Sequence, residues 1–168
     1  MNIQTLSLLA ALVAVSAPFI ASPALAHGAE HGAHGKHSTE TPFGHPGMAA
    51  KVTRTVEVTM NDNMRFNPDT IDVKKGETLR LHIINKGGVV HEFVLGNKAE
   101  LQEHADMMKQ MPDMKHSDAN AISLAGGQTG DVIWTFSKAG SFLFACLVPG
   151  HWEVGMEGHV TVAVPGVN

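Results

Sequence analysis

Apolar and polar positions alternate along most of the chain from Val52 onward, and this pattern predicts short β-strands. Turn-forming sequences, such as Lys86-Gly87-Gly88 and Ala125-Gly126-Gly127, separate the alternating segments. The alternating apolar sets are Val52, Val56, Val58 and Met60; Leu79, Leu81 and Ile83; Val132, Trp134 and Phe136; Phe142 and Phe144; and Val160, Val162 and Val164. Many short strands with regular turns are typical of a β-sandwich, so we predict an all-β domain over residues 51–168.

One segment departs from the strand pattern. Asn97 and Glu100 form a capping-box sequence at its start, and Pro112 marks its end. We therefore predict one short helix over Lys98–Gln110, inserted between strands.

The N-terminal residues resemble an export signal. Residues 6–20 are apolar but short for a membrane span, and Ala24-x-Ala26 is the small-residue pattern of a signal-peptidase site. No Lys or Arg precedes the apolar run, so an uncleaved anchor helix remains the alternative. We predict a signal peptide over residues 1–26, cleavage after Ala26, a periplasmic location, and no membrane span in the mature form.

A histidine-rich segment comes after the predicted cleavage site. Its His residues lie among Gly, Ala, Ser, Thr and Pro, which offer little to bury. Such a segment cannot offset the entropy cost of ordering, so we predict a flexible, disordered arm over residues 27–50.

The amino-acid composition indicates which metals and partners the chain favours. The chain has 11 His, 9 Met and a single Cys, with 12 Lys+Arg against 16 Asp+Glu and a net charge of −4. One Cys excludes an intramolecular disulfide and Cys-pair zinc modules, and the absence of a basic surplus argues against a nucleic-acid partner. Imidazole and thioether groups suit copper far better than magnesium or calcium.

The most specific motif lies near the C-terminus. Cys146, His151 and Met156 have the spacing C-x4-H-x4-M, and His91 stands upstream after a glycine-rich turn. A thiolate and two imidazoles in a plane, with a weak axial thioether, define a blue-copper electron-transfer site. Taken singly, a lone Cys is more often a small buried hydrophobe, and a lone Met is more often part of the core.

Together these residues resemble the cupredoxin, or type 1 blue copper, family over residues 52–164. The resemblance implies a Greek-key β-sandwich with copper at one end. It also implies that His91, Cys146, His151 and Met156 bind the copper through its Cu(I)/Cu(II) cycle. The overall plan resembles that of the CopI-type copper-tolerance cupredoxins of bacteria.

Two further segments are candidates for auxiliary copper binding. The first lies in the arm and the second in and after the predicted helix. Their candidate ligands are His27, His31, His34, His37 and His45, and His104, Met107, Met108, Met111, Met114 and His116. The alternatives are that the arm is a solvated linker, and that Met107, Met111 and Met114 pack on the sandwich at helical spacing.

Two side chains near the motif have alternative interpretations. Asn85 is either a loop-organising residue or an ordinary turn residue. Glu92 is either a surface carboxylate or a group that contacts the metal site. The resemblance implies that the apolar residues around His151, including Leu147 and Val154, form an exposed patch for a transient redox or copper-handling partner.

Two functions fit this sequence. The first is a monomeric periplasmic protein that binds copper, contributes to copper tolerance, and relays electrons or oxidises Cu(I). The second is a dedicated electron carrier like azurin or auracyanin. The sequence contains no His-x-His pair, so a multicopper oxidase is not expected, and we predict a copper-binding protein rather than an enzyme.

Overall fold

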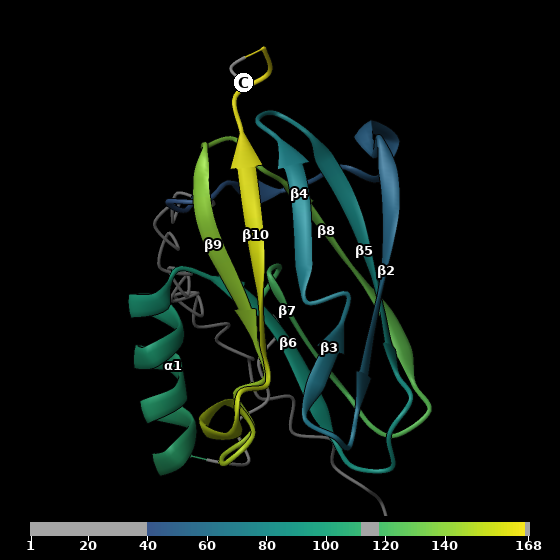
Figure 1. The fold of residues 1–168 in the computed structure, drawn as a ribbon, viewed down its shortest axis with the longest axis vertical. Helices are drawn as coiled ribbons and strands as arrows, with labels where there is room; N and C mark the ends of the chain where they lie inside the picture. The colour runs from purple at the N-terminus through teal and green to yellow at the C-terminus, as the bar shows by residue number, and fades with distance from the viewer. Residues whose placement is uncertain (1–39, 112–117, 167–168) are drawn as a thin grey trace, which may run out of the picture. The chain divides into compact units, whose positions relative to one another are not determined.

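Two five-stranded sheets form a sandwich in the computed structural model, which describes residues 40–111 and 118–166 (Figure 1). The first sheet has the order β1-β8-β5-β2-β3, and the second has the order β4-β10-β9-β6-β7. The first sheet consists of β1 (His45–Pro46), β8 (Thr129–Thr135), β5 (Thr78–Asn85), β2 (Arg54–Asn61) and β3 (Arg65–Asn67). The second consists of β4 (Thr70–Lys74), β10 (Glu157–Ala163), β9 (Gly140–Ala145), β6 (His91–Gly96) and β7 (Ala121–Leu124). The predicted all-β sandwich is confirmed.

Strand pairing brings distant parts of the chain to one end of the sandwich. β6 pairs antiparallel with β9, with Val94 opposite Ala145. The first residue of β6, His91, therefore lies beside the residues that come after β9, where Cys146 stands. Residues 55 positions apart in sequence meet for this reason.

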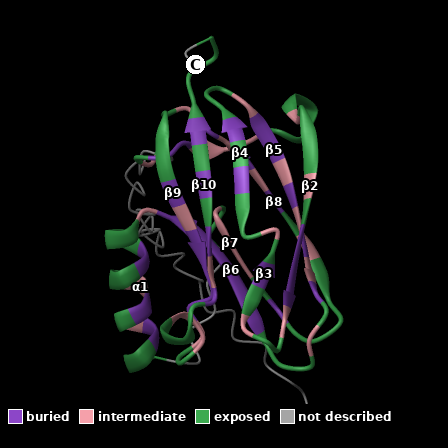
Figure 2. Ribbon diagram, in the orientation of Figure 1, coloured by how far each residue is buried: buried purple, intermediate pink, exposed green. Residues whose placement is uncertain are grey.

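The core lies between the two sheets, and Figure 2 shows buried residues along the strands of both. The alternating residues of β5 and β8 predicted to be apolar and inward are buried, including Leu81 and Trp134. Phe144 stacks on Phe93 with ring centroids 5.1 Å apart, and its ring meets Phe66 edge-on at 5.0 Å. This aromatic cluster packs β3, β6 and β9 together in the core.

The predicted helix is confirmed as α1 (Lys98–Gln110), and its capping box is complete. The Asn97 side chain accepts a hydrogen bond from the Glu100 N–H, and the Glu100 side chain accepts one from the Asn97 N–H. Leu101, Ala105 and Met108 are the buried residues of the helix. Across the part of the chain that the structure describes, no helix combines the length and apolarity needed to span a membrane.

The packing alternative for the helix methionines is wrong for Met111 and does not include Met108. Met108 is buried, whereas Met107 is half-buried and Met111 is 45% exposed. Burial follows Leu101, Ala105 and Met108 because these positions are three and four residues apart on one helix face. Met114 lies outside the described residues.

Residues 40–50 are packed on the sandwich, so the prediction of a flexible arm is wrong for them. Phe43 is 1% exposed and stacks on Trp134 with ring centroids 5.1 Å apart. His45 and Pro46 form β1, which pairs with the end of β8. The buried Phe43 ring and the pairing of β1 with β8 together hold this segment on the sandwich. The rest of the predicted arm, 27–39, lies outside the described residues, as does the predicted signal peptide.

Candidate metal centre

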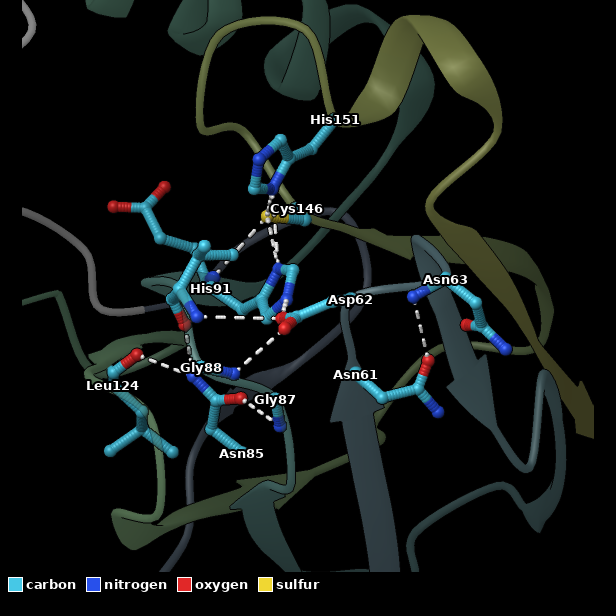
Figure 3. Close-up of polar contacts among 12 residues, drawn as sticks. Asn61, Asp62, Asn63, Asn85, Gly87, Gly88, His91, Leu124, Cys146 and His151 are labelled. Carbon is cyan, nitrogen blue, oxygen red and sulfur yellow. Dashed lines mark hydrogen bonds and ion pairs between the residues drawn. The ribbon is translucent and has the colours of Figure 1, made fainter.

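Three of the four predicted metal ligands converge at one end of the sandwich (Figure 3). The Nδ1 atoms of His91 and His151 lie 3.2 Å apart. The Sγ atom of Cys146 lies 3.3 Å from Nδ1 of His151 and 4.0 Å from Nδ1 of His91. Among the described residues, this is the only group of three or more Cys, His, Asp or Glu side chains that is suited to a metal ion.

Cys146 is fully buried directly after β9. The backbone N–H of Glu92 donates to its Sγ at 3.3 Å, and burial raises the pKa of the thiol to about 11. Without a metal the thiol therefore stays protonated at neutral pH. A metal cation that takes up this sulfur must displace the proton, after which the Glu92 N–H stabilises the thiolate.

Backbone hydrogen bonds close the loop that carries the other predicted ligands. The Cys146 N–H donates to the Met156 carbonyl at 3.0 Å, and the Met156 N–H donates to the His151 carbonyl at 3.1 Å. Between them, Trp152–Val154 form a short 3₁₀ turn that ends at Gly155 with φ 91°, a conformation that favours glycine. Met156, at the end of this loop, is fully buried.

The His91 side of the site is organised by Asn85. This residue is fully buried at the end of β5. Its Nδ2 donates to the carbonyls of Val89 and Leu124 at 2.8 and 2.9 Å, and its Oδ1 accepts the Gly87 N–H at 2.9 Å. Asn85 is therefore the loop-organising residue and not an ordinary turn residue.

Asp62 completes the surroundings of His91 and was not among the predicted site residues. Its carboxylate lies 3.2 Å from Nε2 of His91 and accepts the Gly88 N–H at 2.8 Å. The Gly88 hydrogen bond, more than the contact with His91, lowers the pKa of Asp62. Asp62 comes directly after β2, far from His91 in sequence, and its surroundings of Asn61 and Asn63 predict only a turn.

His151 is half-buried and stays neutral more readily than a free imidazole. Partial burial lowers its pKa, and the neighbouring His91 lowers it further. A neutral imidazole offers Nδ1 as a ligand. His151 is therefore available to a metal at neutral pH.

The donor spacing fits a small cation bound in a plane. Metal–nitrogen bonds of about 2.0 Å and metal–sulfur bonds of about 2.3 Å give donor separations of about 3.5 Å between nitrogens and about 3.7 Å between sulfur and nitrogen. The observed separations are 3.2, 3.3 and 4.0 Å. Only small shifts are needed to seat a metal, and thiolate with imidazole is the donor set of copper.

The other candidate residues do not join this site. His45 lies in β1, opposite Thr135, at the far end of the first sheet. His104, Met107 and Met108 lie on α1 and Met111 directly follows it, all outside the cluster. His27, His31, His34, His37, Met114 and His116 lie outside the described residues.

Two expectations about the surroundings of the site need correction. Glu92 is 8% exposed, so it is not a surface carboxylate. Its strand, β6, pairs with β9 and β7 on its two edges and has the core on one face and α1 on the other. Leu147 is 2% exposed and packs with Leu101 of α1, so it is not part of an exposed patch, whereas Val154 is 57% exposed.

The sequence profile of the copper binding proteins of the plastocyanin/azurin family matches residues 50–163. The chain belongs to this family. Family membership makes copper the cofactor of the fold, and the cupredoxin resemblance in the sequence is confirmed.

Related proteins share most of the chain. It is 53% identical over 136 residues to the copper-resistant cuproprotein CopI of Rubrivivax gelatinosus, covering 81% of this cupredoxin and 82% of the relative. It is 36% identical over 149 residues to the CopI of Pseudomonas aeruginosa PAO1, covering 71% and 82%. Among solved structures, auracyanin A, a "blue" copper protein of Chloroflexus aurantiacus, is similar with a TM-score of 0.56 and 25% identity, covering 65% of this chain and 98% of that one.

Proposed function

We propose that this cupredoxin is a periplasmic type 1 copper protein that contributes to copper tolerance. The observation that carries the proposal is the convergence of one buried thiol and two imidazole Nδ1 atoms within 4.8 Å of one another. The proposed ligands are His91, Cys146 and His151, with Met156 as the weak fourth ligand, because it is buried on the same hydrogen-bonded loop and the family resemblance implies it.

Bound copper supplies one-electron redox chemistry between Cu(I) and Cu(II). The protein's part is to hold the donors in place. Asn85 fixes the loop before His91, and the Cys146–Met156 hydrogen bond fixes the loop that carries His151. Donors held in similar positions in both oxidation states keep the reorganisation energy of electron transfer small, which favours fast electron relay. A single copper site of this kind passes one electron at a time. Slow oxidation of Cu(I) is compatible with it, but we do not propose an enzyme.

The tolerance role is supported by the relatives and by the extra ligand-rich segments. Two relatives at 53% and 36% identity are copper-resistant cuproproteins. We propose that the arm, through His27, His31, His34 and His37, and the helical segment, through His104, Met107 and Met111, bind additional copper. A dedicated electron carrier needs no such segments.

The copper site is tested by colour. The copper-loaded mature protein is expected to show intense visible absorption from thiolate-to-copper charge transfer, and Cys146→Ser is expected to abolish it. His82→Gln is the matched control, since His82 lies on the outer face of β5 and bonds Asp131 instead of the site. A colourless copper complex of the wild-type protein would contradict the proposal.

Growth on copper separates tolerance from electron transport. A deletion strain is expected to become copper-sensitive, with rescue by the wild-type gene and not by a Cys146→Ser gene. The second candidate function, an electron carrier, is favoured by the likeness to auracyanin A. Normal growth on copper combined with a respiratory or photosynthetic defect would support that candidate instead.

Copper stoichiometry tests the auxiliary segments. We expect more than one tightly bound copper per chain, falling on deletion of residues 27–39 or on Met107→Leu with Met111→Leu. The deletion stops before Phe43, which belongs to the core, and Met108 is left intact because it is 3% exposed. One copper per chain in every variant would refute auxiliary binding while leaving the Cys146 site untouched. Cell fractionation and the N-terminal sequence of the mature protein test periplasmic export and cleavage after Ala26.

A further inference from the structure

The carboxylate of Asp62 lies on the side of the His91 ring that faces away from the other donors (Figure 3). The ring offers Nδ1 to the cluster, 3.2 Å from the Nδ1 atom of His151, and Nε2 to Oδ1 of Asp62, also at 3.2 Å. If Nδ1 is to bind a metal, the ring proton must be on Nε2. A carboxylate is an acceptor only, so it selects this tautomer and orients the ring.

Asp62 is itself held in place by the loop that precedes His91. Its Oδ2 accepts the Gly88 N–H at 2.8 Å, and its Oδ1 also lies 3.4 Å from the Val89 N. A side chain at Gly87 would overlap the carboxylate, so the loop and Asp62 fit closely. The carboxylate is thus fixed at two oxygens, and its hydrogen bond to His91 does not depend on a freely rotating side chain.

Burial differs sharply between the two partners. The His91 side chain is fully buried, whereas the Asp62 side chain is 49% exposed. The negative charge therefore stands at the surface, where water solvates it, while the hydrogen bond leads inward to a ligand. This arrangement avoids the large cost of burying a charge and still places an anion one imidazole ring away from the metal position.

We propose that Asp62 is a positioning residue that sets the reduction potential of the copper site through His91, a proposal that rests on the proposed function of that site. A carboxylate hydrogen-bonded to Nε2–H makes the imidazole a stronger donor, and its charge favours Cu(II) over Cu(I). The carboxylate therefore lowers the potential relative to a neutral acceptor at the same place.

The test compares Asp62→Asn with Asp131→Asn. Both substitutions remove one carboxylate that bonds an imidazole, but Asp131 bonds His82 on the outer face of the first sheet, at 2.7 Å. We expect Asp62→Asn to lower the ratio of Cu(II) to Cu(I) affinity about tenfold, which is a potential higher by about 59 mV. Asp131→Asn is expected to leave the potential unchanged. Potentials are measured by redox titration of the visible absorption.

A measurement on the unaltered protein covers the case in which Asp62→Asn does not hold copper. In the diamagnetic Cu(I) protein, nitrogen-15 NMR is expected to show a proton on Nε2 of His91 that exchanges slowly with water. A rapidly exchanging proton at this position would overturn the proposal, as would equal potentials for the wild type and a folded, blue Asp62→Asn protein. Those results would contradict the role of Asp62 but not the copper site. A colourless copper complex of the wild-type protein would contradict both.

Discussion

Replacing Asn85 by alanine tests how far the copper end of the sandwich depends on one buried amide. The substitution removes three hydrogen bonds, to the carbonyls of Val89 and Leu124 and from the N–H of Gly87. Leu124 is 5% exposed, so its carbonyl loses its partner without gaining water, at about 1–3 kcal/mol. Val89 is 46% exposed and Gly87 is half-buried, so each loss there costs about 0.5–1 kcal/mol. We expect a total destabilisation of about 3 kcal/mol.

The assay is urea unfolding of the metal-free protein, so that copper does not mask the loss. Asn120→Ala is the matched control, because Asn120 is half-buried and its Nδ2 makes one bond, to the Leu95 carbonyl at 2.6 Å. We expect about 1 kcal/mol for this control. A loss for Asn85→Ala that is no larger than the control's would refute the view that Asn85 holds the loop before His91.

Three further predictions concern the thiol, the N-terminal segment and the helix. Burial raises the pKa of Cys146 from 9.0 to about 11, so between these pH values the thiol ionises only in the unfolded chain. The free energy of unfolding of the metal-free protein is therefore constant below pH 9 and falls by up to about 2.7 kcal/mol above pH 11. Urea unfolding across this range is expected to show that fall relative to Cys146→Ala, and parallel curves for the two proteins would contradict it. Phe43→Ala is expected to cost about 3–5 kcal/mol by the same assay, because its ring is buried on Trp134 and Phe142; a loss below 1 kcal/mol would return residues 40–50 to the arm. Asn97→Ala removes the N-cap of α1 and is expected to cost about 1 kcal/mol in thermal unfolding, with Asn63→Ala, in an exposed turn, as the neutral control.

The strands and the helix were predictable because their signals are local. Buried residues such as Leu81 and Trp134 alternate with more exposed ones, and this alternation is the pattern of a strand with one face in the core. The capping box at Asn97 is likewise contained in four residues. The meeting of Cys146 with His151 also follows from their spacing on one loop, while the approach of His91 followed from resemblance to a family and not from any local pattern.

The features that the sequence did not predict depend on pairing between strands. Asp62 reaches His91 because β2 pairs with β5, which places the turn after β2 beside the loop after β5. Glu92 is buried because β6 pairs with β7 at its edge and packs against α1 on its outer face, and no pattern around residue 92 encodes either contact. Phe43 lies in a run typical of a linker, and its burial depends on contacts with Trp134 and Phe142 on distant strands.

The helix and the ligand loop form one packed unit, and this decides how the auxiliary copper segment must be studied. Leu147 and Trp152 of the ligand loop pack in the same cluster as Leu101 and Ala105 of α1. Lys109 of the helix also lies 3.5 Å from Glu153, whose carboxylate accepts the Gly150 N–H. Deleting the helix would therefore disturb the loop that carries His151, and a loss of blue colour would not show that the helix binds copper. Substitution of the less buried Met107 and Met111 removes candidate thioether ligands while the packed face remains, so only a fall in stoichiometry with unchanged colour would assign copper to the helix.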